Sequence, residues 1–340
     1  MDNISDFICN IPKAELHLHI EGTFEPEQMF EIAARNYITT EFQTIEELRN
    51  AYKFNNLQEF LDIYYTGAYV LQTEKDFYEL TMAYMKKAAE QNIVHTEIFF
   101  DPQTHLHNGV PFSVFFGGIY NAVVDAEKLY SVHSGIIMCF LRHLSEKSAF
   151  DTLEMSLPYK DKILGVGLDS SEVGNPPEKF RRVFEKARQY GFLTVAHAGE
   201  EGPAAYVHEA LDLLKINRID HGNNSKDSEG LMDEIARKKI PLTMCPLSNL
   251  KLAVVKDLRD HPLKKFLDKN IAVTVNSDDP AYFGGYLNEN LLAVQKALNL
   301  NVDDIILLVK NSFEASFIDE QQKTNYLQMV DNFVAEYINA

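Results

Sequence analysis

Cysteine is scarce in this chain, which carries three among 340 residues. Cys9, Cys139 and Cys245 are odd in number and far apart, so they define no disulfide framework. This usage is typical of a protein of the reducing cytoplasm, and we expect that location. No stretch approaches the roughly 18 uncharged apolar residues of a membrane span, and the first residues lack the basic and apolar segments of a signal peptide.

Basic residues are also few, because 32 Lys and Arg stand against 50 Asp and Glu, for a net charge of −18. This balance disfavours nucleic acid, whose phosphates need a basic face, and it disfavours an anionic membrane surface. A small neutral or cationic ligand suits it better. Hydrophobic residues make up 46% of the chain, enough for a large buried core.

Eight short apolar segments alternate with amphipathic helical patterns. The expected strands are Ala14–His19, Val94–Phe100, Ser134–Phe140, Ile163–Leu168, Leu193–Ala198, Arg218–His221, Leu242–Cys245 and Ala272–Asn276. Helical spacing is clear over Lys179–Tyr190, Tyr206–Leu214 and Glu229–Lys238. The alternation predicts an α/β fold, a (β/α)8 TIM-type barrel that forms a single domain over residues 1–340.

The first expected strand is followed by a helical insertion at about residues 22–90. Thr23–Asn36 and Asn56–Leu71 are its clearest helices. Because an insertion after a barrel strand lies at the catalytic end, we predict that it forms a lid. Its aromatic residues are interpreted mainly as core; they are Phe54, Phe60, Tyr64 and Tyr65.

Histidines lie at or next to the ends of three of the expected strands. His17 and His19 alternate along the first strand and so share one side of it. His197 is the last residue but one of LTVAHA, and His221 ends RIDH. The carboxyl ends of barrel strands meet on one face, so these imidazoles are expected to converge. Three of them form a ligand set that suits zinc, and His221 is a further ligand or a general base. Each alone is equally typical of a packed structural histidine.

Carboxylates accompany these histidines. Glu200 lies three residues after His197, and Asp278 and Asp279 follow the eighth strand. Two adjacent carboxylates repel each other when buried, unless a cation or a shared proton offsets them. A metal ion among the imidazoles would do so. The alternative is a solvated turn before Pro280.

Five motifs in order then carry a resemblance. PKAELHLHIEGT (12–23), HAGE (197–200), DHG (220–222), CPLSN (245–249) and NSDDP (276–280) resemble the adenosine/adenine deaminase family of the amidohydrolase superfamily. EIFFDPQTH, FLRHLS, GLDSSEVGNPP and SDDPAYFGGY resemble its adenine deaminase branch. The resemblance implies a cytoplasmic hydrolase of purine salvage that converts adenine to hypoxanthine and ammonia, with a small purine as its substrate.

The resemblance also implies roles for individual residues. The zinc ligands are His17, His19, His197 and Asp278, and the proton donor is Glu200. His221 lies beside the attacking water, and Asp279 contacts the purine ring. One zinc ion per chain is expected, because the fourth strand, ILGVGLD, lacks the lysine that would bridge a second metal.

Residues around this set have weaker assignments. We interpret Glu172 as filling the space of a ribose and accepting the ring N–H of free adenine; the alternative is an exposed loop glutamate. Ser248 and Asn249 are expected to support the rim, Cys245 to be a packed thiol, and Asp101 and His105 to line the pocket mouth.

Three other functions stay open on the sequence alone. They are adenosine deamination, deamination of N6-substituted adenines, and ligand binding by a barrel that has lost catalysis. The oligomeric state is not predicted.

Overall fold

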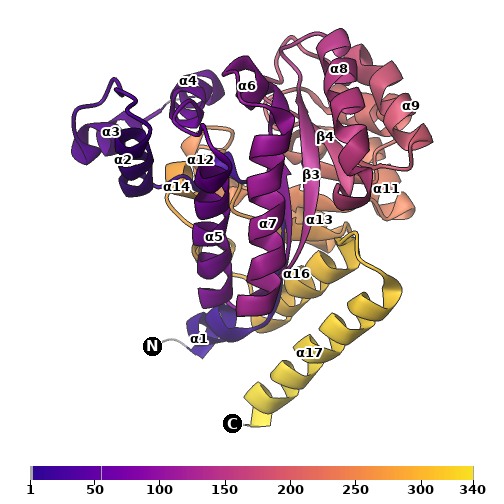
Figure 1. Cartoon of the computed structure of the whole chain (residues 1–340). Helices are drawn as coiled ribbons and strands as arrows, with labels where there is room; N and C mark the ends of the chain where they lie inside the picture. Colours follow the sequence, from indigo (N-terminus) through magenta and orange to yellow (C-terminus); the bar gives the residue numbers. More distant parts are fainter. Residues whose placement is uncertain (1–2, 55, 340) are drawn as a thin grey trace.

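The computed structural model describes residues 3–54 and 56–339. Eight strands follow one another in a single sheet, each parallel to the next along the chain. They are β1 (Lys13–His19), β2 (Ile93–Phe100), β3 (His133–Leu141), β4 (Gly165–Asp169), β5 (Leu193–Ala198), β6 (Arg218–His221), β7 (Leu242–Met244) and β8 (Val273–Val275). The predicted α/β barrel class is thereby confirmed, and helices surround the strands (Figure 1).

The seam between β8 and β1 closes through residues beyond the last strand. The Asp278 amide donates to the His17 carbonyl at 3.1 Å, and the His19 amide donates to the Asp278 carbonyl at 3.0 Å. The Asn276 side chain accepts from the Leu16 amide at 2.8 Å. The observed β8 is one residue shorter at each end than the predicted strand, 272–276. The bonding across the seam fixes Asp278 against the two histidines of β1.

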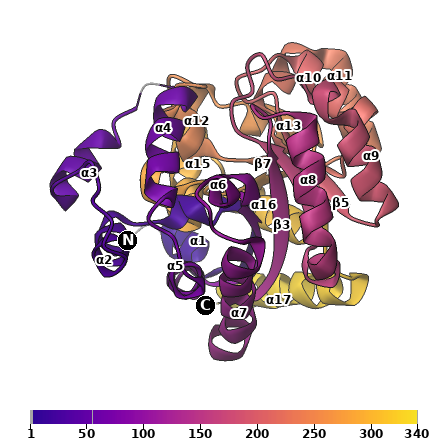
Figure 2. The same ribbon diagram turned by 45° about the horizontal axis from the view of Figure 1, so that its top comes forward.

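Helices occupy most of the connections, and both described ends of the chain lie at the end of the barrel opposite α4 (Leu57–Ala68) (Figures 1 and 2). The connections after β2 hold α6 (Pro102–His107), α7 (Phe112–Tyr130), α8 (Glu146–Ser156), α9 (Arg181–Gln189), α10 (Ala204–Glu209), α11 (Glu229–Lys238), α12 (Pro246–Lys251) and α13 (Leu263–Asp268). After β8 come α14 (Pro280–Phe283), α15 (Leu287–Leu298), α16 (Val302–Ala315) and α17 (Glu320–Asn339), and α1 (Asn3–Asn10) precedes β1. Among the described helices, none has the length and apolarity to cross a bilayer.

Local sequence explains where several of these helices begin. Ser228 accepts from the Leu231 amide at the start of α11, whose bounds match the predicted 229–238. Asn301 and Asp304 form a capping box at the start of α16. The predicted helix 206–214 begins earlier, at Ala204, and its second half is a π turn over Ala210–Leu214.

Residues 21–90 contain the connection between β1 and β2. It consists of a short turn at Glu21–Thr23, α2 (Pro26–Arg35), α3 (Ile45–Ala51), α4 (Leu57–Ala68) and α5 (Glu74–Glu90). The predicted 23–36 helix begins later, at Pro26, because proline fixes the first helical turn there. α4 packs Phe60 and Tyr64 inward, both buried, and brings them to the carboxyl ends of the strands.

Candidate active site

A cavity opens at the carboxyl ends of the strands. Its polar wall comes from residues at or just after β1, β2, β4, β5, β6 and β8, and its apolar wall comes largely from α4. The barrel therefore brings together side chains that are more than 250 positions apart, such as His19 and Asp278. This is the face on which barrel enzymes hold their reacting groups.

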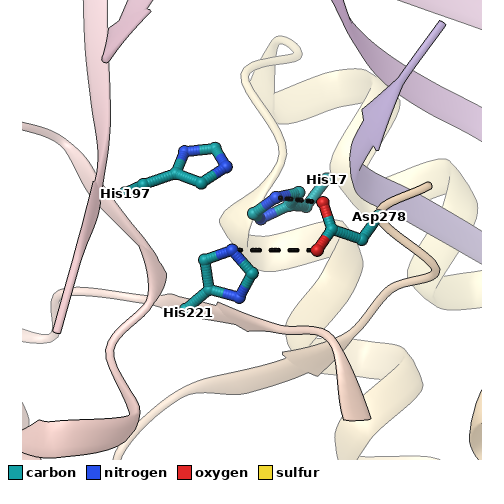
Figure 3. A group of neighbouring side chains, drawn as sticks. All are labelled: His17, His197, His221 and Asp278. Carbon is teal, nitrogen blue, oxygen red and sulfur yellow. Dashed lines mark ion pairs between the residues drawn. The ribbon is translucent and has the colours of Figure 1, made fainter. Parts of the chain in front are cut away.

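The four predicted zinc ligands lie close together; His19, His197 and Asp278 line the cavity, and His17 is buried beside them. His17 Nε2 is 3.2 Å and His19 Nε2 is 3.5 Å from Asp278 Oδ1. His19 Nε2 is also 3.2 Å from His197 Nε2. His221 joins the group, since His17, His197, His221 and Asp278 place one donor atom each within 4.8 Å of one another (Figure 3).

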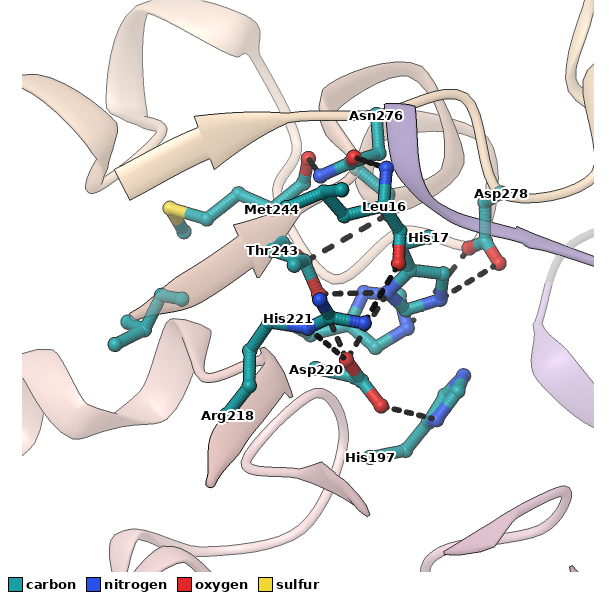
Figure 4. Close-up of polar contacts among 12 residues, drawn as sticks. Leu16, His17, His197, Arg218, Asp220, His221, Thr243, Met244, Asn276 and Asp278 are labelled. Carbon is teal, nitrogen blue, oxygen red and sulfur yellow. Dashed lines mark hydrogen bonds and ion pairs between the residues drawn. The ribbon is translucent and has the colours of Figure 1, made fainter. Parts of the chain in front are cut away.

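The outer nitrogens of His17 and His197 face polar groups that fix the orientation of the rings (Figure 4). Thr243 donates its hydroxyl to Asp220 at 2.9 Å, so its oxygen is free to accept from His17 Nδ1 at 3.0 Å. His17 then carries its proton on Nδ1 and turns a lone pair on Nε2 toward the cluster. The outer nitrogens of His197 and His19 lie 3.6 Å from Asp220 and Asp169, respectively.

The protonation states of the histidines and of Asp278 favour the binding of a cation. Burial lowers the pKa of His19 to about 4 and that of His197 well below its usual value, so both rings are neutral. Burial alone would raise the pKa of Asp278, but the neighbouring histidines lower it below its usual range. His17 Nε2 is buried with no hydrogen-bond partner among the described residues. Neutral imidazoles, an ionised carboxylate and an unpartnered inner nitrogen are a donor set that fits zinc.

Two residues of the site have left-handed backbone conformations that side chains other than glycine rarely adopt. The φ angle is +62° at His221 and +65° at Asp278. Such strain persists only where the surroundings fix it, as the two backbone bonds of Asp278 to β1 do. These angles turn both side chains toward the cluster.

Glu200 lies in the loop after β5 and lines the cavity. Burial, followed by the charges of Asp278 and Glu172, raises the pKa of its carboxyl well above the usual range. One oxygen, Oε1, is buried without a hydrogen-bond partner among the described residues, and Oε2 is 3.6 Å from His221 Nε2. The raised pKa favours the protonated acid, and Glu200 faces a space in which a ligand can accept a proton.

Asn249 contacts the Nδ1 side of the His221 imidazole. The Asn249 side-chain oxygen accepts from Asn223 at 2.8 Å and from His261 at 3.1 Å, so its amide N–H faces His221 Nδ1 at 3.4 Å. His221 then carries its proton on Nε2, toward Glu200 and Asp278. The support expected from Asn249 is thus present, whereas the Ser248 hydroxyl has no partner among the described residues.

Asp279 also lines the cavity, and its Oδ1 has no hydrogen-bond partner among the described residues. Burial, followed by the charge of Asp278, raises the pKa of Asp279 well above its usual value. The pKa values of the adjacent carboxyl groups predicted after the eighth strand thus shift in opposite directions: that of Asp278 is lowered and that of Asp279 is raised. Cys245, in contrast, is buried and directs its thiol to the Thr243 carbonyl, away from the cluster.

Glu172 differs from its prediction. It does not line the cavity; its two carboxylate oxygens accept from the backbone amides of residues 199, 200, 201 and 202 at 2.6–3.0 Å. These bonds direct the carboxylate to the backbone of residues 199–202 and not to the cavity, so the structure gives no support to the predicted purine contact. The alternative, an exposed loop glutamate, is wrong, because Glu172 is 1% exposed.

Several cavity residues were not predicted, or were predicted differently. Asp169 ends β4 and lines the cavity, as its position at a strand end would have suggested. Asp101 lines the cavity, whereas His105 lies behind it and bonds Glu21 at 2.7 Å. The insertion aromatics Phe60, Tyr64 and Tyr65 face the cavity and not only the core.

Comparisons with known proteins identify the family and the fold of the chain. The family model described as adenosine deaminase matches residues 12–333. The chain is 59% identical over 329 residues to the adenine deaminase of Acinetobacter baylyi, with 97% of this chain and 99% of the relative covered. The crystal structure of an adenine deaminase from Arthrobacter aurescens superposes with a TM-score of 0.94 at 45% identity, covering 96% of this chain and 99% of that one. A zinc-bound amidohydrolase from Burkholderia ambifaria has the same fold, with a TM-score of 0.92 at 23% identity over 100% of this chain and 96% of that one.

Proposed function

This chain belongs to the adenosine deaminase family, and on that premise we propose that it is a zinc-dependent adenine deaminase. The observation that carries the proposal is the 59% identity to a protein named adenine deaminase over 97% of the chain. The convergence of neutral imidazoles, one carboxyl group of lowered pKa and one glutamate of raised pKa at the cavity supports it. The reaction would be the hydrolysis of adenine to hypoxanthine and ammonia.

The ligands of one zinc ion per chain would be His17, His19, His197 and Asp278. When bound, zinc lowers the pKa of water from about 15.7 toward 7 and so supplies a nucleophile at neutral pH. His221 Nε2–H, with Glu200 and Asp278 as neighbours at 3.6 and 3.8 Å, would hold the attacking oxygen against C6 of the purine.

Glu200 and Asp278 would move the protons. As water adds to C6, one of its protons passes to Asp278, and Glu200 donates its own proton to N1, which offsets the loss of ring aromaticity. The proton on Asp278 then goes to the departing amine, and the C6–N6 bond breaks to release ammonia. The remaining hydroxyl proton returns to Glu200, and C6 becomes the carbonyl of hypoxanthine. Glu200 thus begins and ends protonated, in agreement with its raised pKa.

Asp279 and Asp101 would form hydrogen bonds with the five-membered ring of the purine. The proton on Asp279 can be donated to N7. Free adenine carries a ring N–H where adenosine carries ribose, and Asp101 Oδ1 lines the cavity without a hydrogen-bond partner among the described residues. Tyr64 bonds the other Asp101 oxygen at 3.2 Å and so brings α4 over this end of the cavity. We assign to Asp101 the N–H contact that the sequence analysis gave to Glu172.

The helices of residues 22–90 would serve as a lid over the bound base, with α4 as its inner face. Tyr65 bonds Ser170 at 2.9 Å and Ser171 bonds Gln58 at 3.1 Å, which ties α4 to the loop after β4. The buried, free thiols Cys139 and Cys245 agree with a cytoplasmic enzyme, in which the reaction would serve purine salvage.

A substrate panel tests the proposed function. Purified protein with zinc should convert adenine with a kcat/KM in the usual enzyme range of about 10⁴–10⁸ M⁻¹s⁻¹, followed by ultraviolet absorbance and by ammonia release. Adenosine and 9-methyladenine lack the ring N–H and should react at least about 10²-fold more slowly. A preference for adenosine would make the chain an adenosine deaminase, and a preference for N6-methyladenine would favour a deaminase of N6-substituted adenines.

A substitution at Gly22 tests the role of Asp279. A Cβ atom at Gly22 would lie 1.9 Å from Asp279 Oδ1 and 2.6 Å from its Cα, so Gly22→Ala must displace Asp279. We expect kcat/KM for adenine to fall about 10²-fold, as for a misplaced binding group. Gly230→Ala is the matched control, because a Cβ there meets nothing within 4 Å. Unchanged kinetics in Gly22→Ala would argue against a substrate contact by Asp279.

A further inference from the structure

The segment from His197 to Gly202 carries a predicted zinc ligand and the predicted proton donor, yet only its first two residues belong to a strand. Gly199 has a φ angle of +73°, where the chain turns out of β5. A loop of this kind has few contacts of its own to fix a carboxyl group, because loops lack the regular backbone bonding of helices and strands. Its backbone polar groups must therefore find partners elsewhere.

Glu172 supplies partners for the amides of this segment. Its Oε1 accepts from Gly199 at 2.6 Å, and its Oε2 accepts from Glu200 and Glu201 at 3.0 Å each and from Gly202 at 2.8 Å. Successive N–H groups that point to one anion form an anion-binding nest, and here the chain supplies its own anion. Gly202 permits the approach, because a Cβ there would lie 2.6 Å from Glu172 Oε1.

Arg142, which follows β3, binds the start of the same segment. Its side chain is fully buried, and Nη1 donates to the His197 carbonyl at 2.7 Å while Nε donates to the Asn175 carbonyl at 2.9 Å. The positive charge thus lies at the carbonyl of His197, and the negative charge of Glu172 lies at the amides that follow. The bonds to backbone carbonyls and amides offset part of the cost of burying these two charges, and Arg142 Nη2 alone of the guanidinium nitrogens has no partner among the described residues.

We infer that Arg142 and Glu172 form a clamp that fixes the backbone from His197 to Gly202 and thereby orients the Glu200 carboxyl toward the substrate. Both are positioning residues, since neither lines the cavity. The inference rests on the proposed function in one respect, namely that Glu200 is the proton donor. It also accounts for the FLRHLS and GLDSSE motifs, which contain Arg142 and Glu172 and which the mechanism leaves unused.

The test begins with Glu172→Gln, which preserves side-chain size but places an amide N–H₂ against backbone donors. We expect kcat for adenine to fall about 10²-fold, the cost of a slightly misplaced reacting group, while KM changes less than about threefold and zinc per chain is unchanged. Glu172→Asp keeps the charge and should recover part of kcat. Arg142→Lys keeps one donor for the His197 carbonyl and should be milder than Arg142→Met.

Hydrogen exchange gives a readout that does not depend on activity. The amides of residues 199–202 should be protected in the wild-type protein and exchange at least about tenfold faster in Glu172→Gln. Glu178→Gln, an exposed Glu on the following turn, is the matched control and should leave both exchange and kcat unchanged. Val183→Ala, in the fully buried face of α9, should lower the unfolding temperature without changing kcat.

The outcomes separate the clamp from the proposed function. If the wild-type protein does not deaminate adenine, the function fails, and the exchange result still tests the clamp. If Glu172→Gln retains wild-type kcat and wild-type protection of residues 199–202, the clamp is wrong. If both Glu172→Gln and Val183→Ala lower kcat in proportion to lost stability, Glu172 has only a structural role and the inference is also overturned.

Discussion

Glu200→Gln is expected to lower kcat for adenine about 10³-fold, in the middle of the range for loss of a general acid. Glutamine has nearly the same shape, so the buried pocket should be preserved. It cannot give a proton to N1, and water has no clear route to replace that proton, because Glu200 is 4% exposed. KM should change little, since the proton transfer stabilises the transition state more than the bound substrate.

Steady-state kinetics of Glu200→Gln, with zinc content measured on the same preparation, check this expectation. Zinc should stay at one ion per chain, because Glu200 is not among the predicted ligands. Glu178→Gln serves as the exposed control, and Glu200→Asp should be intermediate because it retains an acid that stops short of N1. A Glu200→Gln enzyme within tenfold of wild-type kcat would mean that another group protonates the purine.

The sequence located these reacting groups because barrel geometry converts position along a strand into position in space. His17 and His19 alternate on β1, His197 is the last residue but one of β5, and His221 ends β6, so the C-terminal ends of the strands bring all four rings together. The rule needs no knowledge of side-chain packing. It applies equally to Asp169, which ends β4 and lines the cavity but was predicted only as part of a motif.

The hydrogen bonds of Glu172 could not be predicted from its position relative to a strand end. Its partners are backbone amides 27 to 30 residues away, in a loop whose turn at Gly199 has no periodic signature. A side chain that bonds backbone leaves no pattern of partner residue types in the sequence. The same limit applies to the left-handed conformations of His221 and Asp278, since both residue types occupy ordinary conformations elsewhere.

Helical periodicity also left the role of α4 open. It identifies an apolar face, and Phe60 and Tyr64 lie on it. It does not tell whether that face packs on other side chains or closes a cavity, because both environments favour the same residues. The hydroxyl bonds of Tyr64 to Asp101 and of Tyr65 to Ser170 distinguish the two, and they depend on residues from β2 and β4.

Asp278→Asn is expected to remove both zinc and activity while the barrel remains folded. Asp278 is the one anion among the predicted ligands, and asparagine offers a neutral oxygen of the same reach, a much poorer ligand for a divalent cation. Its backbone bonds to His17 and His19 do not depend on the side chain, so the seam between β8 and β1 should survive. We expect the activity on adenine to fall more than about 10³-fold, because water then keeps a pKa close to 15.7.

Metal analysis and thermal unfolding decide the outcome without reliance on kinetics. Chelated wild-type protein should regain activity when zinc is added, and its unfolding temperature should rise with zinc concentration, because the ion binds only the folded chain. Asp278→Asn should show neither response, whereas Asp151→Asn, a surface control on α8, should show both. If the Asp278→Asn protein still binds one zinc ion per chain and turns over adenine, the fourth zinc ligand must be a different residue. His221 is then the candidate, because it belongs to the same group of donor atoms within 4.8 Å.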